Sequence, residues 1–147
     1  MDALELLKQD HQKVKELFEQ ADEIEDEKEQ KQICERISSE LETHAHIEET
    51  IFYPAMEKHS QLKDMVRESL KEHNQIKSIL QELAALKDSE EFESKFQDLQ
   101  ETVSHHAEEE EEGKMFPQVR EIVDKADLEK LGKDLEAAKG KRQQTAS

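Results

Sequence analysis

The stretch SHHAEEEEEGKMFPQV, residues 104–119, places two adjacent histidines ahead of five consecutive glutamates. The apolar residues upstream of it, from Phe92 to Val103, recur at three- and four-residue steps, and His106 continues their stripe. This spacing places side chains on one face of an α-helix. The stretch therefore predicts a helix whose inward face carries a histidine at a position where a hydrophobic residue is expected.

Four amphipathic segments of this kind follow one another along the chain. They are predicted to span Ala3 to about Glu25, roughly 27–58, about 61–86, and a fourth segment that starts near Asp88. Asp2 and Asp88 are the expected N-caps of the first and fourth helices. Long amphipathic helices joined by short turns predict an all-α, up-down-up-down four-helix bundle over residues 1–122. A short fifth helix, about 128–139, and a flexible tail are expected within residues 123–147.

The composition limits the classes of function. Charged residues make up 40% of the 147 residues, and the formal net charge is −17. Nucleic-acid binding needs a basic face, so neither a nucleic acid nor an anionic membrane surface is an expected partner. No apolar stretch approaches the roughly 18 residues of a membrane span. The single Cys34 cannot form an intrachain disulfide, which favours a reduced, cytoplasmic location.

The chain also repeats itself. HQKVKELF from His11 resembles HNQIKSIL from His73, at an offset of 62 residues. EETIFYPAM from Glu48 resembles EEGKMFPQV from Glu111, at an offset of 63 residues. The bundle is therefore predicted to consist of two related helical hairpins, each with one histidine on its first helix and a His/Glu pair on its second.

Polar residues on the inward stripes predict a metal site. A single histidine on an apolar stripe is more often a hydrogen-bonded core residue, but His11, His44, His73 and His106 place one on each of the four helices. Glu48, four residues after His44, lies on the same helix face. A buried carboxylate is costly unless something compensates it. Imidazole and carboxylate ligands suit iron, manganese or zinc. With a glutamate from the fourth helix, the candidates number six, which exceeds the needs of one tetrahedral zinc ion.

Two glutamates compete to be the ligand on the fourth helix. Simple helical phase offers Glu110, four residues after His106. Glu111 is instead in phase with the apolar residues downstream, and it precedes Pro117 by six residues, as Glu48 precedes the first proline. One extra residue before Glu111 would fit a π-bulge, a feature that concentrates at functional sites. The pattern favours Glu111 and keeps Glu110 as the alternative.

The combined motifs resemble the hemerythrin-like, or HHE cation-binding, domain over roughly residues 1–122. The patterns that carry the resemblance are DH at 10–11, HAHIEETIFYP at 44–54, EH at 72–73 and HAEEEEEGKMFP at 106–117. The resemblance implies a four-helix bundle that holds two non-haem iron ions bridged by carboxylates, with zinc or manganese as alternative metals. It assigns the metal ligands to His11, His44, Glu48, His73, His106 and a glutamate of the acidic run, with Glu111 favoured over Glu110.

The resemblance also implies a range of functions. The leading hypothesis is a protein that binds oxygen or a related small ligand, such as nitric oxide or peroxide, for sensing, storage or scavenging. A di-iron enzyme that processes peroxide or nitric oxide, or an iron-handling protein, is the alternative. A helical interaction module with a structural metal or none is a third. Oxygen-carrying members have a second histidine where this chain has Lys77, so coordination at one iron must differ, with water or Glu49 in that position. Tyr53 is a candidate hydrogen-bond donor to a metal-bound group.

Overall fold

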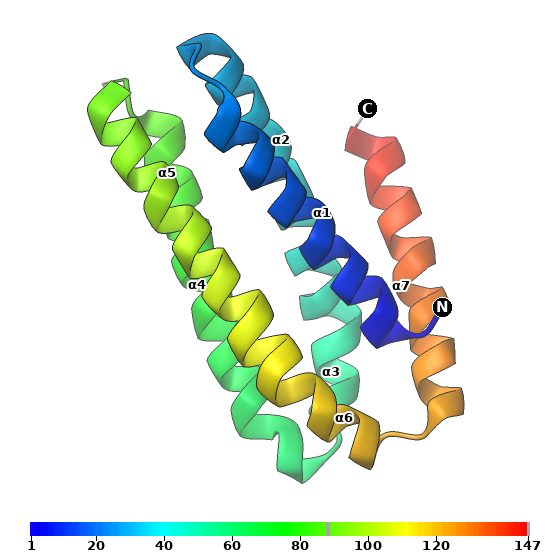
Figure 1. Cartoon of the computed structure of the whole chain (residues 1–147). Coiled ribbons are helices and arrows are strands. Elements are labelled where there is room, and N and C mark those ends of the chain that lie inside the picture. Colours follow the sequence, from blue (N-terminus) through cyan, green and yellow to red (C-terminus); the bar gives the residue numbers. More distant parts are fainter. Residues whose placement is uncertain (88, 147) are drawn as a thin grey trace.

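Helices make up nearly all of the fold (Figure 1). The computed structural model describes residues 1–87 and 89–146. Its α-helices are α1 (Ala3–Glu23), α2 (Glu27–Ile47), α3 (Tyr53–Met56), α4 (Lys63–Ala85), α5 (Ser89–Ser104), α6 (Phe116–Ile122) and α7 (Lys125–Ala146). Two π-helical segments, η1 (Glu48–Phe52) and η3 (His105–Met115), and a short 3-10 turn, η2 (Ser60–Leu62), lie between them.

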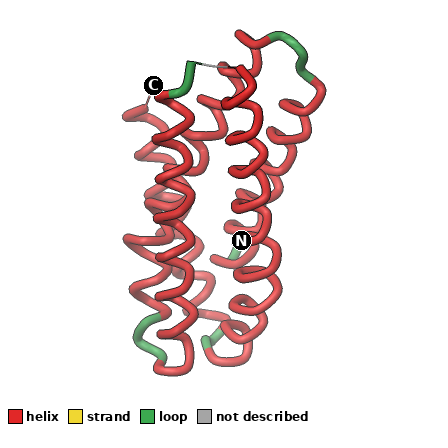
Figure 2. Tube along the Cα trace, turned by 90° about the vertical axis from the view of Figure 1, so that its left-hand side faces the viewer, coloured by secondary structure: helices red, strands yellow, loops and turns green. Residues whose placement is uncertain are grey.

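Four rods form the bundle, as the sequence predicts. The second rod joins α2, η1 and α3, and the fourth joins α5, η3 and α6, while α1 and α4 are the first and third. Helix α1 packs against α2, and α4 packs against α5, so each hairpin pairs consecutive rods. Figure 2 shows the rods side by side along the molecule, with the connections between them at its two ends. The predicted fold class is confirmed.

Both prolines follow a π-helical segment, and this explains why neither ends its rod. The amide of Tyr53 donates to the carbonyl of Glu48, and the amide of Phe116 donates to that of Glu111, five residues back in each case. Proline has no amide hydrogen, and its ring clashes with the carbonyl four residues earlier in an α-helix. Each proline lies at the start of the next helix, where it is tolerated. The rods therefore continue past the prolines.

Asp2 caps α1 as predicted, because its Oδ1 accepts the amide of Glu5 at 2.9 Å. The backbone becomes extended at Ile24, so α1 ends about two residues earlier than expected. The predicted cap at Asp88 lies outside the described residues.

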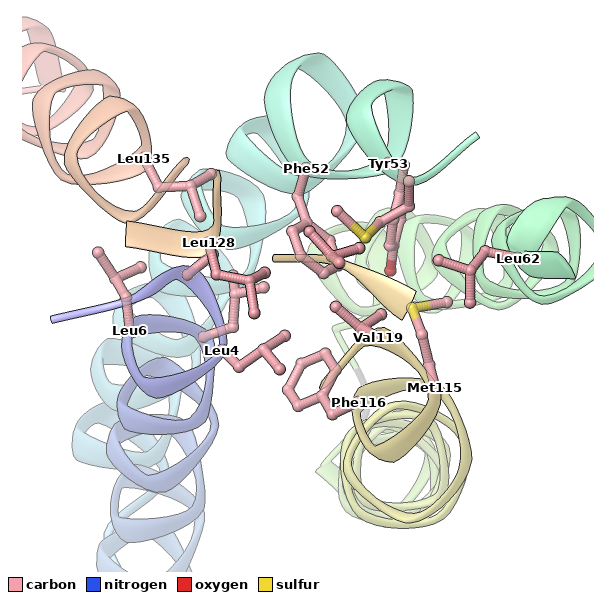
Figure 3. Packing of buried hydrophobic residues seen from close by; sticks show 14 of the residues in the cluster. Leu4, Leu6, Phe52, Tyr53, Leu62, Met115, Phe116, Val119, Leu128 and Leu135 are labelled. Atoms are coloured by element: carbon pink, nitrogen blue, oxygen red, sulfur yellow. The ribbon is translucent and has the colours of Figure 1, made fainter. Parts of the chain in front are cut away.

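The C-terminal helix is longer than the sequence predicts. Helix α7 spans 22 residues, starts before residue 128 and continues to Ala146, through most of the segment expected to be a flexible tail. Its leucines pack onto the start of α1, as Figure 3 shows for Leu128 and Leu135 beside Leu4 and Leu6. The two backbones also approach closely, since a Cβ atom at Gly132 would lie 2.3 Å from the carbonyl oxygen of Met1. Packing against α1 and α2 therefore supports this helix.

The apolar core has two parts. One cluster lies around the start of α1 together with α3, α6 and α7, and the other lies around the end of α1 together with α2, α4 and α5. Along α1, the first cluster ends at Leu7 and the second begins at Val14, with Asp10 and His11 between them. The same gap occurs on each of the other three rods. A polar layer is therefore enclosed between two apolar clusters that exclude water from above and below it.

No helix within the described ranges is both long and apolar enough to cross a membrane.

Candidate metal centre

The polar layer brings together all six residues that the sequence singled out. Their ligand atoms form two groups of three, each with atoms within 4.8 Å of one another. The groups consist of His11, His44 and Glu111, and of His73, His106 and Glu48. Each hairpin therefore supplies both histidines of one group and the carboxylate of the other. This exchange ties the two hairpins together at the centre of the bundle.

Each of the two carboxylates also contacts the other group. Glu48 Oε1 lies 3.0 Å from His44 Nε2 and 3.2 Å from His73 Nε2. Glu111 Oε1 lies 3.0 Å from His11 Nε2 and 3.5 Å from His106 Nε2. Both glutamates are fully buried. All four imidazoles thus turn Nε2 toward the shared carboxylates.

The arrangement leaves buried polar atoms unsatisfied. His44 Nε2 and both carboxylate oxygens of Glu48 have no hydrogen-bond partner among the described residues. The 3.0 Å between His44 Nε2 and Glu48 Oε1 brings these atoms into ionic contact, but they are not aligned for a hydrogen bond. A buried charged group without partners costs several kcal/mol, on the order of 3. A cation between these atoms would satisfy them, and their nitrogen and oxygen donors suit iron, manganese or zinc.

A second ring of carboxylates holds the outer nitrogens of the same histidines. Each Nδ1 atom lies near one carboxylate oxygen, at 2.8 Å for His11–Glu112, 3.0 Å for His44–Asp10, 2.9 Å for His73–Glu49 and 2.5 Å for His106–Glu72. A carboxylate at Nδ1 favours a proton there and leaves the Nε2 lone pair directed inward. This is the usual second sphere of a metal-binding histidine.

The outer carboxylates are residues that the sequence reasoning missed. Asp10 and Glu72 each precede a ligand-candidate histidine and are related by the 62-residue offset, while Glu49 and Glu112 each follow a glutamate and are related by the 63-residue offset. The internal repeat was therefore a signal that could have found them. Without the repeat, acidic residues next to the candidate ligands would be interpreted as solvent-exposed, because the whole chain is rich in acidic residues.

The buried histidines and carboxylates of the polar layer shift one another's pKa values. Burial favours the neutral imidazole of His11, yet its hydrogen bonds to Glu111 and Glu112 raise its pKa to about 9. Burial likewise opposes charge on His44, but Glu48 and Asp10 raise its pKa well above the usual value. Burial would raise the pKa of Glu111, whereas His106 and neighbouring groups hold it well below its usual range. Without a metal, the neighbouring carboxylates therefore favour the protonated imidazoles of His11 and His44.

The two groups differ in one aromatic neighbour. Tyr53 and Phe116 are equivalent in the repeat. The Tyr53 hydroxyl donates to Glu111 Oε2 at 2.6 Å and lies 3.3 Å from His73 Nε2. The Phe116 ring stacks on His11 with centroids 6.1 Å apart. The predicted role of Tyr53 as a donor within the site therefore has the required geometry, and its hydroxyl lies between Glu111 of one group and His73 of the other.

The side of the centre that contains His11 and His44 is reached from outside. A groove of about 760 Å³ runs between α1 and the α5–η3 rod, and its lining includes His11 and His44. His73 and His106 do not line this groove, and they are 3% and 4% exposed. A small molecule in the groove would thus meet the group that contains His11.

Lys77 and Glu49, at the position where a second histidine is absent, form a pair outside the centre. Lys77 Nζ lies 3.0 Å from Glu49 Oε1, and Glu49 Oε2 lies 2.9 Å from the outer nitrogen of His73. Glu49 therefore supports His73 instead of replacing a ligand. On the fourth rod, Glu111 is buried in the centre, whereas Glu110 is partly exposed and pairs with Lys114. Glu111 thus lies in the buried layer and Glu110 outside it, and a π-helical segment contains both residues.

Tyr53→Phe removes the hydrogen bond to Glu111 and leaves the ring in place. Second-sphere partners of this kind contribute roughly 10–100-fold to metal affinity, so we expect a loss of about 10-fold. Competition with a chromogenic chelator measures the change, and the far-ultraviolet circular dichroism spectrum should be unchanged. An affinity equal to that of the wild type would show that the hydroxyl does not hold Glu111 in its binding position.

Two successive contacts, called the relay below, connect the C-terminal helix α7 to the centre. Lys139 Nζ donates to Asp10 Oδ1, and Asp10 Oδ2 lies 3.0 Å from His44 Nδ1. We expect Asp10→Asn to weaken metal binding by roughly 10–100-fold and Lys139→Met by less, since it acts through Asp10. Lys133→Met, at an exposed position of the same helix, is the matched control. Equal affinities for Lys139→Met and the control would exclude the relay.

Known proteins resemble the chain in both sequence and structure. The family model described as "Hemerythrin HHE cation binding domain" matches residues 2–119. A crystal structure of a hemerythrin HHE cation binding domain-containing protein from Mycobacterium kansasii superimposes with a TM-score of 0.86 and 26% sequence identity. That similarity covers 99% of this chain and 90% of the other. No curated protein is a significant match.

Proposed function

Because this chain belongs to the hemerythrin HHE cation-binding domain family, we propose that its buried layer holds two iron ions bridged by Glu48 and Glu111. We infer that the centre binds oxygen or a related small ligand, such as nitric oxide or peroxide, for sensing, storage or scavenging. Zinc and manganese fit the same donor atoms and are the alternative metals.

One observation carries this proposal. Each carboxylate lies between a histidine of one group and a histidine of the other, and all four Nε2 atoms turn toward these carboxylates. Two imidazoles and two shared carboxylates for each ion match the carboxylate-bridged centres of four-helix bundles. The unpartnered atoms of His44 and Glu48 support it further, because a purely structural core would pair them.

The chain's own residues have distinct roles in this function. Bound iron would supply reversible electron exchange and open coordination positions for a small ligand. The groove beside His11 admits a small molecule, and Phe116 and its neighbours form an apolar wall that limits water. The outer carboxylates Asp10 and Glu112 hold the two imidazoles on this side in one orientation.

Peroxide or nitric oxide turnover at the same centre is a second candidate. The Tyr53 hydroxyl supports it, since it places a buried proton donor 2.6 Å from Glu111 Oε2, within the proposed centre. Catalysis uses such a proton, whereas simple storage of a ligand does not need it. Iron handling remains an alternative for the same donor set.

Metal analysis and optical spectra of one sample test the proposal. Protein loaded anaerobically with ferrous iron should retain about two ions per chain after desalting, and oxygen should produce near-ultraviolet absorption of ferric iron with carboxylate ligands. Binding of zinc alone, or of no metal, would overturn the iron assignment. Stopped-flow mixing with peroxide separates binding from turnover, because a catalyst consumes many equivalents and a carrier does not.

A further inference from the structure

The groove beside His11 is strongly acidic. Seven carboxylates and two lysines line it, so its lining carries a formal net charge of −5 with neutral histidines. Over the whole chain, acidic residues outnumber basic ones by only 38 to 21. Asp10 and Glu112 lie where the groove meets the centre, and the other carboxylates are Glu19, Asp22, Glu101, Glu108 and Glu109. The groove therefore concentrates negative charge beyond the average of the chain.

A second groove, of about 480 Å³, shows that this charge is a local feature. Two carboxylates, Glu42 and Glu49, and two cationic side chains, Lys77 and Arg142, line it, so its formal charges balance. None of the four histidines of the buried groups, all within the described ranges, lines this second groove. The excess of negative charge thus belongs to the groove that reaches two of these histidines.

The acidic groove extends well beyond the centre. Along α1, its lining runs from Lys8 to Asp22, a span of roughly 20 Å at 1.5 Å per residue. Apolar side chains, including Phe18 and Val103, form part of its walls. A cleft with charges of one sign and walls of low dielectric constant focuses the electric field and draws ions of the opposite sign inward. A neutral diatomic ligand needs neither this length nor this charge, whereas a cation responds to both.

The inner end of the groove contains an unsatisfied nitrogen atom. His44 lines the groove and is 8% exposed, and its Nε2 atom has no hydrogen-bond partner among the described residues. The neighbouring ring of His11 lies 4.9 Å away, and its Nδ1 atom contacts Glu112, a carboxylate that is 31% exposed. A buried nitrogen without a partner is costly, and a cation that arrives along the groove would compensate it.

We propose that the groove is the entry route for divalent metal ions, and that its carboxylates draw these cations toward His11 and His44 and repel anions. Hydrated cations enter from solution, and Glu112 is the last carboxylate that they meet before the buried groups. The carboxylates farther out lie beyond the ligand atoms, so they affect mainly the rate of uptake. The destination of the ions rests on the proposed function, whereas the attraction of cations into the groove does not.

Stopped-flow mixing of the full chain with Co²⁺ measures the rate of entry, because visible absorption rises when histidine and carboxylate bind this ion. A triple variant, Glu19→Gln with Asp22→Asn and Glu101→Gln, removes three charges from the groove and leaves the buried groups intact. We expect uptake to slow by roughly 10-fold at low salt, and the difference to disappear near about 1 M salt, where the field is screened. The matched control removes the same charge at exposed positions outside the groove, Glu57→Gln, Glu68→Gln and Glu121→Gln.

Lys15 provides a test with the opposite sign. Its ammonium lies 3.4 Å from Glu108 Oε1 and joins α1 to the fourth rod across the groove. Lys15→Met removes a positive charge from the path, so uptake should become about 3-fold faster. Lys133→Met, at an exposed position of α7 outside the groove, should keep the wild-type rate. A general disturbance of the fold would not slow uptake in the triple variant and accelerate it in Lys15→Met.

Equal rates of uptake in the triple variant and its control would overturn the entry route and leave the proposed function intact. A second measurement does not depend on the buried centre. In Glu48→Gln, which disrupts the buried groups, Mn²⁺ should broaden the amide signal of Gln97, in the acidic groove, more than that of Gln81, in the second groove. These two residues lie nine positions from His106 and eight from His73, at similar distances along their rods.

The outcomes of the Mn²⁺ measurement separate the two proposals. Stronger broadening at Gln97, together with a wild type that retains no metal after desalting, would overturn the buried centre and support the attraction of cations into the groove. Equal broadening at Gln97 and Gln81 would overturn that attraction, whatever the buried centre binds.

Discussion

Glu111→Gln is expected to reduce the affinity of the buried centre for metal by at least about 100-fold, since second-sphere changes alone cost roughly 10–100-fold. Glu111 Oε1 contacts a histidine of each group, so this substitution should affect both of the proposed metal positions. Glutamine keeps the shape of the side chain but removes the charge that a bridging ligand supplies. Metal content after desalting, measured together with the circular dichroism spectrum, should fall while the helices remain.

Glu110→Gln is the matched control, because it changes the neighbouring residue of the same π-helical segment in the same way. Glu110 pairs with Lys114 and faces His105 outside the two buried groups, so its substitution should leave the affinity of the buried centre for metal unchanged. Retention of the buried ions in Glu111→Gln, with their loss in Glu110→Gln, would contradict the assignment. It would then favour the regular four-residue step from His106.

Helical phase and the internal repeat together were sufficient to predict the buried layer. Each inward histidine interrupts an apolar stripe. A position on such a stripe is enough to predict that the side chain points into the bundle. The choice between Glu110 and Glu111 needed the phase of the apolar residues downstream and the repeat, because the extra residue of a π-helical segment breaks the simple four-residue step from His106. Glu48 and Glu111 each belong to the group whose two histidines come from the other hairpin. This relation depends on how the hairpins pack, so neither segment of the sequence shows it.

Other features were beyond sequence reasoning for physical reasons. Asp10 and Lys139 are far apart in the sequence, and their contact depends on how α7 packs on the bundle. The length of α7 was underestimated because its charged residues suggest fraying, whereas its leucines and the close approach at Gly132 hold it on α1.

Removal of the metal is expected to lower the melting temperature strongly. An ion held at 1,000 times its dissociation constant stabilises the native state by about 4 kcal/mol, so two such ions contribute about 8 kcal/mol. For a chain of this size, that corresponds to a fall of roughly 16–30 °C on chelation. Differential scanning calorimetry with and without a chelator measures the fall. An unchanged melting temperature would show that no metal is coupled to this fold.

The fall in melting temperature on chelation should be larger at pH 9 than at pH 6.5, because protons and metal compete for the imidazoles. Glu111 and Glu112 raise the pKa of His11 to about 9 despite its burial, from the ordinary value of 6.5. This raised pKa stabilises the metal-free protein by about 3 kcal/mol below pH 6.5, and that contribution is lost as the pH rises through 9. Metal binding needs the neutral imidazole, so it strengthens over the same range.

His11→Gln should flatten this pH dependence, whereas His46→Gln, at an exposed position, should preserve it. A fall that is equal at both pH values in the wild type would mean that His11 does not exchange its proton for metal.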